Sequence, residues 1–342
     1  MNKKPQTTIK DIADYLGISH TTVSRALNDK PTINEKTKTR VRQACRKLGY
    51  IQNVAAKTMR GSQSSVIGLI VPDIENVFYA GVAKSIAQAC NNESFQLLLM
   101  ISEDDPEREY EHIKILREYL AAGVIIIPSE SILPESIKLL KKLTVVQMLR
   151  VNDRIGNIRV TFNDKKALAL ATRHLLDLGH TRIAYIGGLR SLSTGEARYQ
   201  GFCSAIKNKG ISLKNTIRYC GQPREEFARK SIANLVNHSS SVTAVVFGGT
   251  RLTESGIEAL MEHGLSIPDD ISVIGYGDPP WFRFLAGGIT TIRLPVREFA
   301  DHTASRLFDL IRKGSKPSKT DQPVKSDMFE PAIIIRSSSR NL

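Results

Sequence analysis

Residues 8–28 read TIKDIADYLGISHTTVSRALN and combine the features of two short helices joined by a sharp turn. Apolar side chains at helical spacing predict one buried stripe on each helix. Gly17 breaks the first helix where the turn is needed, and Ser19 is a good N-cap for the second. The apolar positions are Ile9, Ile12, Ala13 and Leu16 in the first helix and Val23, Ala26 and Leu27 in the second.

The second of these helices carries short polar groups and one guanidinium on its other face. Side chains of this kind read base edges in the major groove of DNA. A plain helical hairpin with a solvated face is the alternative, but turn, cap, stripe and polar face all agree on a DNA-reading helix-turn-helix. The polar positions are His20, Thr21, Thr22, Ser24 and Arg25.

The charge of the 342-residue chain is unevenly spread. Residues 1–61 hold thirteen Lys or Arg against four Asp or Glu, a net +9, while the remaining 281 residues carry +5 of the total +14. A positive head on a near-neutral body indicates nucleic acid as its partner. A membrane surface is the competing partner, but no Trp- or Phe-rich amphipathic helix occurs in the head. The length predicts two or three domains.

Cysteine usage and hydropathy exclude other classes. The cysteines are widely spaced without a CxxC pair, so we expect small core residues, no zinc site and a reducing, cytoplasmic setting. The N-terminus lacks an apolar signal segment, and no run of about 18 apolar residues predicts a membrane span. We expect no metal and no cofactor. The cysteines are Cys45, Cys90, Cys203 and Cys220.

A third helix and a short hinge are expected after the helix-turn-helix. The third helix is capped by Asn34 or Thr32 and ends at Gly49. Its basic face is either solvated or placed against phosphates; it consists of Lys36, Lys38, Arg40, Arg42, Arg46 and Lys47. Residues 53–60 predict a hinge helix. Eight residues are marginal alone in water, so we expect this helix to fold only with DNA and a second copy present.

From Val66 onward the pattern alternates between strands and helices. It predicts an α/β fold, a two-lobed core of doubly wound parallel sheets, with a ligand site between the lobes beyond the carboxyl ends of the strands. The expected strands are 66–72, 95–101, 123–128, 145–149, 183–187, 217–220, 244–247 and 272–276. The expected helices are 78–93, 107–122, 134–142, 164–178, 195–209, 225–237 and 252–264.

Over nearly its whole length the chain resembles the LacI/GalR family of bacterial transcription repressors. The motifs that carry the resemblance are TIKDIA at 8–13, TVSRALN at 22–28, LGY at 48–50, IGLIVPD at 67–73, HL at 174–175, LGH at 178–180, IGG at 186–188, PDDISVIGY at 268–276 and TTIRLP at 290–295. The resemblance implies a DNA-binding head at 1–51, a hinge and linker at 52–65, and an effector-binding core at 66–342 similar to periplasmic sugar-binding proteins. Three crossovers would divide that core into an N-lobe (about 66–161 and 295–320) and a C-lobe (about 163–290 and 325–340).

The resemblance also assigns DNA contacts. His20, Thr21 and Arg25 match positions that read bases. Matches to phosphate contacts, or to supports for them, are Thr8, Ser19, Thr22, Ser24, Asn28 and Tyr50. In the hinge the matching positions are Asn53, Ala56 and Met59. Met59 stands where the family has a leucine that wedges into the minor groove, so it either wedges or packs hinge against hinge.

Effector contacts carried over from the family are Asp73, Phe78, Tyr79, Arg150, Thr194, Arg198 and Asp278. The Asp73 carboxylate is suited to accept hydrogen bonds from hydroxyl groups. Phe78 and Tyr79 either stack on a sugar ring or are core residues. Arg198 either enters the ligand or forms an ion pair that braces the lobes.

Two positions depart from the family pattern. Thr250-Arg251 replaces the usual Asn-Asp, and Gly277 replaces an aspartate, so two carboxylates are lost and one guanidinium is gained. This predicts a net positive cleft in which Arg251 helps to bind a sugar acid or sugar phosphate. In the alternative, Arg251 points outward or pairs with Glu254 or Asp278, and the effector is a neutral sugar.

The predicted function is a transcription regulator, most consistent with a repressor, that binds a palindromic operator in double-stranded DNA as a homodimer under control of a small carbohydrate-type effector. An enzyme is not expected, because no nucleophile elbow, P-loop or HExxH motif occurs. A sugar-binding protein for import is not favoured, because it would not need the DNA-reading head. An architectural DNA-binding protein is not favoured either, because it would not need the two-lobed core. The sequence contains no leucine heptad repeat, so a tetramer is not expected.

Overall fold

The computed structural model describes residues 7–50, 64–156, 158–238, 242–314 and 325–342. The chain divides into two compact units, residues 1–63 and 64–342, which are treated separately below. The predicted hinge helix, with Asn53, Ala56 and Met59, lies outside the described residues.

The N-terminal unit is formed by α1 (Ile9–Leu16), α2 (His20–Leu27) and α3 (Glu35–Leu48). The predicted local signals explain each helix end. Thr8 caps α1 in a reciprocal hydrogen-bonded box with Asp11, and Gly17 ends it with a φ of 65°, a conformation that costs glycine little. Ser19 caps α2, and Asn34 rather than Thr32 caps α3. The buried core consists of Ile12, Ala13, Val23, Ala26, Val41 and Ala44.

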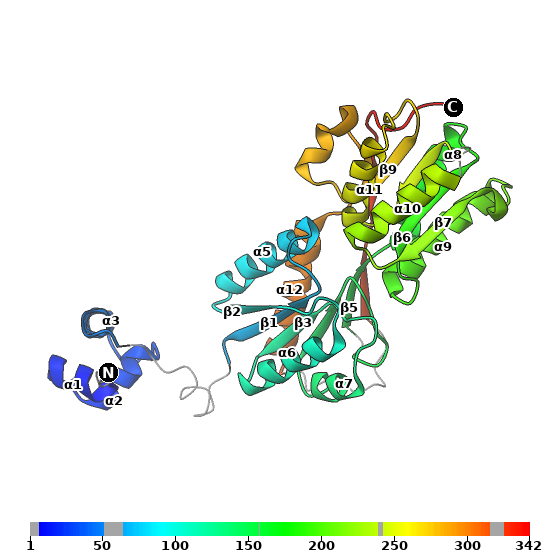
Figure 1. Ribbon diagram of the computed structural model, residues 1–342. Helices are drawn as coiled ribbons and strands as arrows, with labels where there is room; N and C mark the ends of the chain where they lie inside the picture. The colour runs from blue at the N-terminus through cyan, green and yellow to red at the C-terminus, as the bar shows by residue number, and fades with distance from the viewer. Residues whose placement is uncertain (1–6, 51–63, 157, 239–241, 315–324) are drawn as a thin grey trace, which may run out of the picture. The chain divides into compact units, whose positions relative to one another are not determined.

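The larger unit contains two six-stranded sheets. Their strand orders are β11-β5-β4-β3-β1-β2 in the N-lobe and β12-β10-β9-β8-β6-β7 in the C-lobe. All neighbouring strands are parallel except β10 and β12. Figure 1 shows helices packed around both sheets, as a doubly wound fold requires.

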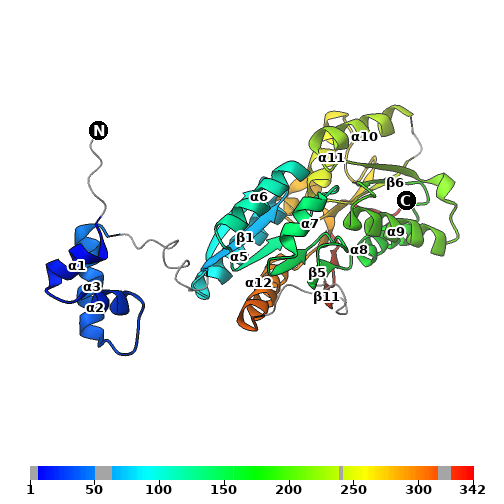
Figure 2. The ribbon, with the colours of Figure 1, turned by 90° about the horizontal axis from the view of Figure 1, so that it is seen from below.

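The N-lobe elements are β1 (Val66–Val71), α5 (Val77–Asn92), β2 (Gln96–Ile101), α6 (Pro106–Glu118), β3 (Gly123–Ile126), α7 (Pro134–Leu140), β4 (Val145–Met148), β5 (Ile158–Phe162), α12 (Val296–Arg312) and β11 (Lys325–Phe329). Its strands are buried on both faces, so neighbouring residues belong to different clusters. Leu69 packs on the side of α5 and α12, whereas Ile70 packs on the side of α6 and α7. Figure 2 shows α6 and α7 across the N-lobe sheet from α12.

The C-lobe elements are α8 (Asp164–Asp177), β6 (Ile183–Gly188), α9 (Ser193–Asn208), η1 (Leu213–Asn215), β7 (Ile217–Gly221), α10 (Glu225–His238), β8 (Ala244–Phe247), α11 (Thr250–Glu262), β9 (Ser272–Tyr276), η2 (Pro280–Arg283), η3 (Leu285–Gly287), β10 (Thr290–Arg293) and β12 (Ala332–Ile334). Helices α8 and α9 pack together on one face of the C-lobe sheet and belong to the cluster that is shared with the N-lobe. Helices α10 and α11 pack together over a separate hydrophobic cluster of the C-lobe. No helix among the described residues is long and apolar enough to cross a membrane.

One lobe assignment was wrong. Residues 325–340 were expected in the C-lobe, with one final strand near residues 328–336. Instead β11 pairs in parallel with β5 of the N-lobe, from Lys325 opposite Ile158 to Phe329 opposite Phe162. The chain then crosses through Glu330 and Pro331 to β12. A proline cannot donate to a ladder, so it separates two strands where the pattern suggested one.

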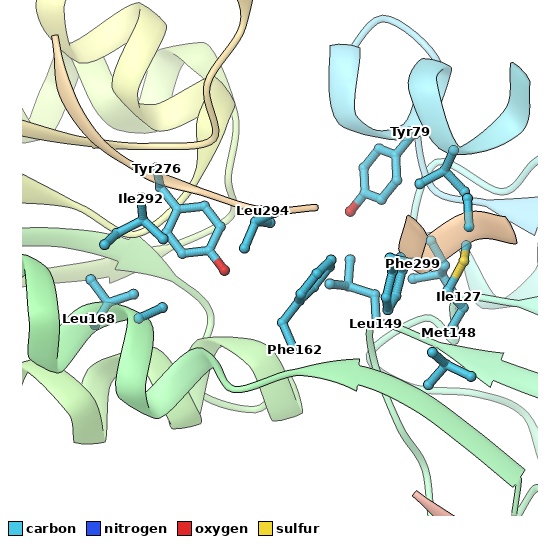
Figure 3. Close-up of a cluster of buried hydrophobic side chains, with 14 of the residues drawn as sticks. Tyr79, Ile127, Met148, Leu149, Phe162, Leu168, Tyr276, Ile292, Leu294 and Phe299 are labelled. Carbon is cyan, nitrogen blue, oxygen red and sulfur yellow. The ribbon is translucent and has the colours of Figure 1, made fainter. Parts of the chain in front are cut away.

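The hydrophobic core continues from one lobe to the other. A single cluster includes Tyr79 and Phe299 of the N-lobe together with Leu168 and Tyr276 of the C-lobe. Figure 3 shows Leu294, on the β10–α12 crossover, between Tyr276 and the N-lobe side chains. The two lobes are therefore in contact at the crossovers. The carboxyl ends of their strands lie outside this contact and form the walls of a cleft.

Candidate nucleic-acid interface and ligand cleft

The exposed face of α2 carries the side chains predicted to read bases. His20, Thr21 and Arg25 are all exposed, while Val23 and Ala26 on the opposite face are buried in the unit's core. Arg25 makes no ion pair with any residue in the described ranges. Its five N–H donors therefore face water, in the fork geometry that matches a guanine edge.

The start of α2 is held by a hydroxyl cluster. The Ser19 hydroxyl accepts a hydrogen bond from the Thr22 amide at 3.1 Å and lies 2.8 Å from the hydroxyls of both Thr21 and Thr22. At the other end, Asn28 donates to the Ser24 carbonyl at 2.9 Å. These contacts restrict both ends of the helix, and at its N-terminus the positive end of the dipole and the free amides favour a phosphate.

The basic face predicted on α3 is only partly available. Lys38 is buried and bridges Asp29 and Glu35, each at 2.8 Å. Arg42 also pairs with Asp29, and Lys47 donates to the Tyr15 hydroxyl at 2.8 Å. Lys38 therefore braces the unit and is not part of a phosphate-facing row. The exposed cations of this helix with neither an ion pair nor a side-chain hydrogen bond to a described residue are Lys36, Arg40 and Arg46.

A cavity of about 630 Å³ lies between the lobes at the carboxyl ends of their strands. This is where parallel α/β sheets bind ligands. Its walls come from the loops that follow β1, β2 and β4 in one lobe and β6, β7 and β8 in the other, with Tyr276 at the end of β9 and Leu294 after β10. The predicted residues that line it are Asp73, Phe78, Tyr79, Arg150, Thr194, Arg198 and Arg251.

The N-lobe wall contains a buried ion pair. Both terminal nitrogens of Arg150, which is 5% exposed, donate to the carboxylate of Asp104, the second of them at 3.2 Å. Burial lowers the pKa of Arg150, but Tyr79 and Asp104 outweigh it and raise the pKa above its usual value. Burial also raises the pKa of Tyr79, so the Tyr79 hydroxyl stays protonated and can donate a hydrogen bond.

Strained backbone surrounds this pair. Glu103, Asp104 and Leu149 line the cavity and have φ values of 55°, 59° and 65°, in the left-handed region that non-glycine residues rarely adopt. Such conformations cost roughly 1–3 kcal/mol each and cluster at functional sites. The Arg150–Asp104 pair ties the two loops together and so helps to hold them in this conformation.

The aromatic residues of the N-lobe wall belong both to the hydrophobic core and to the cavity lining. Phe78 lines the cavity, yet its ring also packs at 6.1 Å from that of Phe162 and 5.3 Å from that of Tyr79. Tyr79 is 8% exposed and belongs to the core cluster. These rings are therefore core residues whose edges form the cavity wall.

The C-lobe wall centres on Arg198. Its Nε donates to Asp164 at 2.7 Å, its Nη1 donates to the Gly248 carbonyl at 2.9 Å, and its guanidinium stacks 4.1 Å over the Tyr276 ring. Asp164 also accepts a hydrogen bond from the Tyr276 hydroxyl. All three side chains belong to the C-lobe, so the pair supports the cavity wall and does not brace one lobe against the other. Arg198 itself lines the cavity, so its guanidinium forms part of the surface that a ligand would meet.

Arg251 connects the lobes. Its Nη1 donates to Asp73 at 3.0 Å and its Nη2 to Glu75 at 3.1 Å, across the cavity from α11 to the loop after β1. It therefore neither points outward nor pairs with Glu254 or Asp278, the two alternatives considered from the sequence. Asp278 lies outside the cavity lining, where Arg293 and Arg336 hold its buried carboxylate at 3.0 and 2.7 Å.

The two departures from the family pattern depend on each other. Gly277 has a φ of 86°, and a Cβ atom there would lie 2.4 Å from the Thr250 hydroxyl. An aspartate at 277 would be strained and would collide with Thr250. The positive φ and the contact with Thr250 therefore favour glycine at position 277.

The predicted net positive cleft was wrong. The cavity lining has four guanidiniums, but these face six carboxylates: Asp73, Glu75, Glu103, Asp104, Glu225 and Glu226. Of these carboxylates only Asp73 was predicted from the sequence, and Asp164, the buried partner of Arg198, was not predicted either. A local signal existed for Asp104, since it follows a predicted strand end, as cleft residues do.

Comparison with known proteins identifies the family. Residues 8–53 match the model of bacterial regulatory proteins of the lacI family, and residues 172–339 match the periplasmic binding protein-like domain. The chain is 31% identical to the HTH-type transcriptional repressor PurR of Glaesserella parasuis serovar 5 (strain SH0165), over 98% of this chain and 99% of that protein. The chain belongs to the LacI/GalR family. The regulator GalR of Escherichia coli (strain K12) is 27% identical over 97% of this chain and 95% of its own length.

Solved structures confirm the expected fold. The lac repressor dimer bound to operator and the anti-inducer ONPF has a TM-score of 0.83 at 21% identity, covering 98% of this chain and all of that one. A complex of the regulator CelR with cellobiose has a TM-score of 0.69 at 21% identity and the same coverage. The chain is thus a DNA-binding transcription regulator, and members of this family are not enzymes and act in the cytoplasm.

Proposed function

We propose that this regulator is a repressor that binds a palindromic operator as a homodimer and is controlled by an uncharged carbohydrate in the cleft. The PurR relative is named a repressor, the lac repressor structure is a dimer on its operator, and the CelR structure holds cellobiose. The proposed domains are the DNA-binding head (1–51), the hinge and linker (52–65) and the effector-binding core (66–342).

On the DNA side, we assign base reading to His20, Thr21 and Arg25, whose exposure on one face of α2 supports the role. Two copies would place two α2 helices in major grooves about one helical turn apart, which makes the operator palindromic. Proposed phosphate contacts or supports are Thr8, Ser19, Thr22, Ser24, Asn28 and Tyr50. The hinge residues Asn53, Ala56 and Met59 remain predictions, with Met59 as the minor-groove wedge.

The pairing of the cleft guanidiniums carries the proposal of an uncharged ligand. Arg150, Arg198 and Arg251 each already donate to a protein carboxylate. A two-point contact between an anionic ligand and one of these three guanidiniums would have to displace its carboxylate, whereas a sugar hydroxyl needs only one donor or acceptor that remains. The proposed contacts are Asp73, Phe78, Tyr79, Asp104, Arg150, Thr194 and Arg198.

A sugar acid or sugar phosphate is the second candidate. Arg224 lines the cavity, is exposed, and pairs with no acidic group in the described part of the chain. A single exposed guanidinium at the rim provides one charge-assisted contact, fewer than the two-point binding that buried arginine clusters offer an anion. We therefore rank a sugar acid or sugar phosphate below an uncharged sugar.

A thermal-shift panel of neutral sugars, sugar acids and sugar phosphates tests the ligand class. A ligand at 100 times its Kd adds about 2.7 kcal/mol to stability, so the responding class is visible directly. We expect neutral sugars to respond, and the variant Asp73→Asn to lose the response while Lys209→Ala keeps it. A response to acids or phosphates alone would contradict the proposal. Operator affinity with and without the responding sugar then shows whether it releases or promotes DNA binding, with a coupling of about 1–3 kcal/mol.

A further inference from the structure

Arg251 binds two carboxylates of the opposite lobe through one planar group. It is the second residue of α11, and both of its partners lie in the loop after β1. Asp73 is itself fixed, because its other oxygen accepts the Glu75 amide at 2.8 Å. The fork of the guanidinium therefore meets an acidic loop that is already ordered to receive it.

A second set of contacts joins the lobes near the start of α9, and it has different chemistry. The Ser193 hydroxyl accepts a hydrogen bond from the Val151 amide at 3.1 Å, and the Ser191 hydroxyl donates to Glu130. These contacts contain no pair of opposite charges. A rise in ionic strength will therefore weaken the contact made by Arg251 more than these hydrogen bonds.

The Arg251 pairs are open to water. The side chains of Arg251, Asp73 and Glu75 are 32%, 30% and 77% exposed. Exposed pairs contribute modestly and are screened by salt. A contact of this strength shifts an equilibrium between closed and open lobes without locking it.

We propose that Arg251 is an ionic latch that holds the cleft closed in the ligand-free protein. Opening the cleft on this side requires Arg251 to release both Asp73 and Glu75. The consequence for ligand binding rests on the proposed function: a sugar hydroxyl at Asp73 would share that carboxylate with Arg251, so the latch sets how ligand binding is coupled to lobe closure. Arg251 is then a positioning residue that acts through Asp73.

The size of the effect follows from the exposure of the pairs. Two exposed ion pairs on one guanidinium are expected to change the ratio of closed to open protein by about 2- to 10-fold. A shift of this size is measurable as a change in a distance distribution between the lobes.

The test measures the interlobe distance in full-length, ligand-free protein. Spin labels on non-canonical residues would replace the exposed Lys141 in the N-lobe and Lys207 in the C-lobe. In low salt we expect one short distance for the wild type and a second, longer one for Arg251→Met. Raising NaCl to about 0.5 M should move the wild type toward the variant and leave the variant unchanged. Arg251→Lys, which keeps the charge but loses the fork, should lie between them.

The matched control is Lys209→Ala, which removes an exposed pair with Asp177 inside the C-lobe and should behave like the wild type. Far-UV circular dichroism establishes that each variant is folded. If Arg251→Met does not fold, the exchange of charges in the double variant Asp73→Arg, Arg251→Asp replaces it and should restore the short distance. An Arg251→Met distribution equal to that of the wild type in low salt would overturn the latch. Because no sugar is present, a wrong ligand class cannot cause that result.

Discussion

The reading face of α2 and the wall of the cleft both carry arginines, but they hold them in opposite states. Arg25 is exposed and pairs with no acidic group in residues 7–50. In the cleft, the buried Arg150 pairs with Asp104, and the largely buried Arg198 pairs with Asp164. A surface that binds a polyanion gains by keeping its cations free, since each one releases a counterion on binding. A cleft for an uncharged ligand gains by pairing its charges in advance, which avoids the cost of burying an unpaired ion.

The largest difference between the two regions should be in how strongly salt weakens ligand binding: operator affinity should depend on ionic strength far more than sugar affinity. If the dimer contacts about 6–10 phosphates, operator affinity falls roughly 10³- to 10⁵-fold between about 50 and 200 mM salt. Affinity for the neutral sugar should change less than about 2-fold, because no net charge is neutralised. Fluorescence anisotropy with operator DNA and calorimetry with the sugar measure the two slopes. Equal slopes would remove the contrast.

Removing the carboxylate beneath Arg198 should have the next largest effect. Asp164 is 4% exposed and accepts hydrogen bonds from Arg198 and Tyr276. Asp164→Ala leaves a buried guanidinium without its partner, so we expect a loss of about 3–5 kcal/mol in the free energy of unfolding, measured with urea. Asp177→Ala removes the exposed pair with Lys209 and should cost less than about 1 kcal/mol. A small loss for both would contradict the commitment of Arg198 to Asp164.

A buried carboxyl group without a cation should make stability depend on pH. Glu109 is fully buried and hydrogen-bonded to Ser129, and burial raises its pKa to about 7. Between pH 4.5 and 7 the unfolded chain ionises this group while the folded protein keeps it protonated, so stability falls as pH rises through that window. The full effect is on the order of 3 kcal/mol.

Urea denaturation at several pH values compares the wild type with Glu109→Gln, which retains the shape and can still bond Ser129. The difference in stability between the two proteins should change across the window and level off above it. A difference independent of pH would show that Glu109 is ionised in the folded protein.

Substitution of Arg25, the arginine on the exposed face of α2, should have the smallest of these effects. Arg25→Ala should cost about 1–3 kcal/mol on the preferred operator and relax discrimination at one base pair, as measured by anisotropy on matched and substituted sites. Arg25→Lys keeps the charge but loses the fork, so it should retain non-specific affinity and lose discrimination. An unchanged site preference in both variants would exclude base reading by this residue.

The helix-turn-helix was predictable because its signals are local. The Thr8–Asp11 box and the Ser19 cap join residues three positions apart, and Gly17 stands where the first helix ends. Helix ends and apolar stripes depend on such short-range relations. The position of the cleft was also predictable, because strand ends follow from the alternating pattern.

The partners of the cleft arginines were decided only by the tertiary structure. Arg198 and Asp164 are 34 positions apart, Arg150 and Asp104 are 46 apart, and Arg251 and Asp73 are 178 apart. No local pattern records such pairs, because sheet order and the three crossovers bring them together. The position of β11 was also decided by the tertiary structure, because β11 pairs with the free edge of β5 in the N-lobe sheet. From its sequence alone this chain is a LacI/GalR regulator with a DNA-reading head. Whether its arginines are free or paired, and so which kind of ligand its cleft suits, depends on contacts between residues distant in the chain.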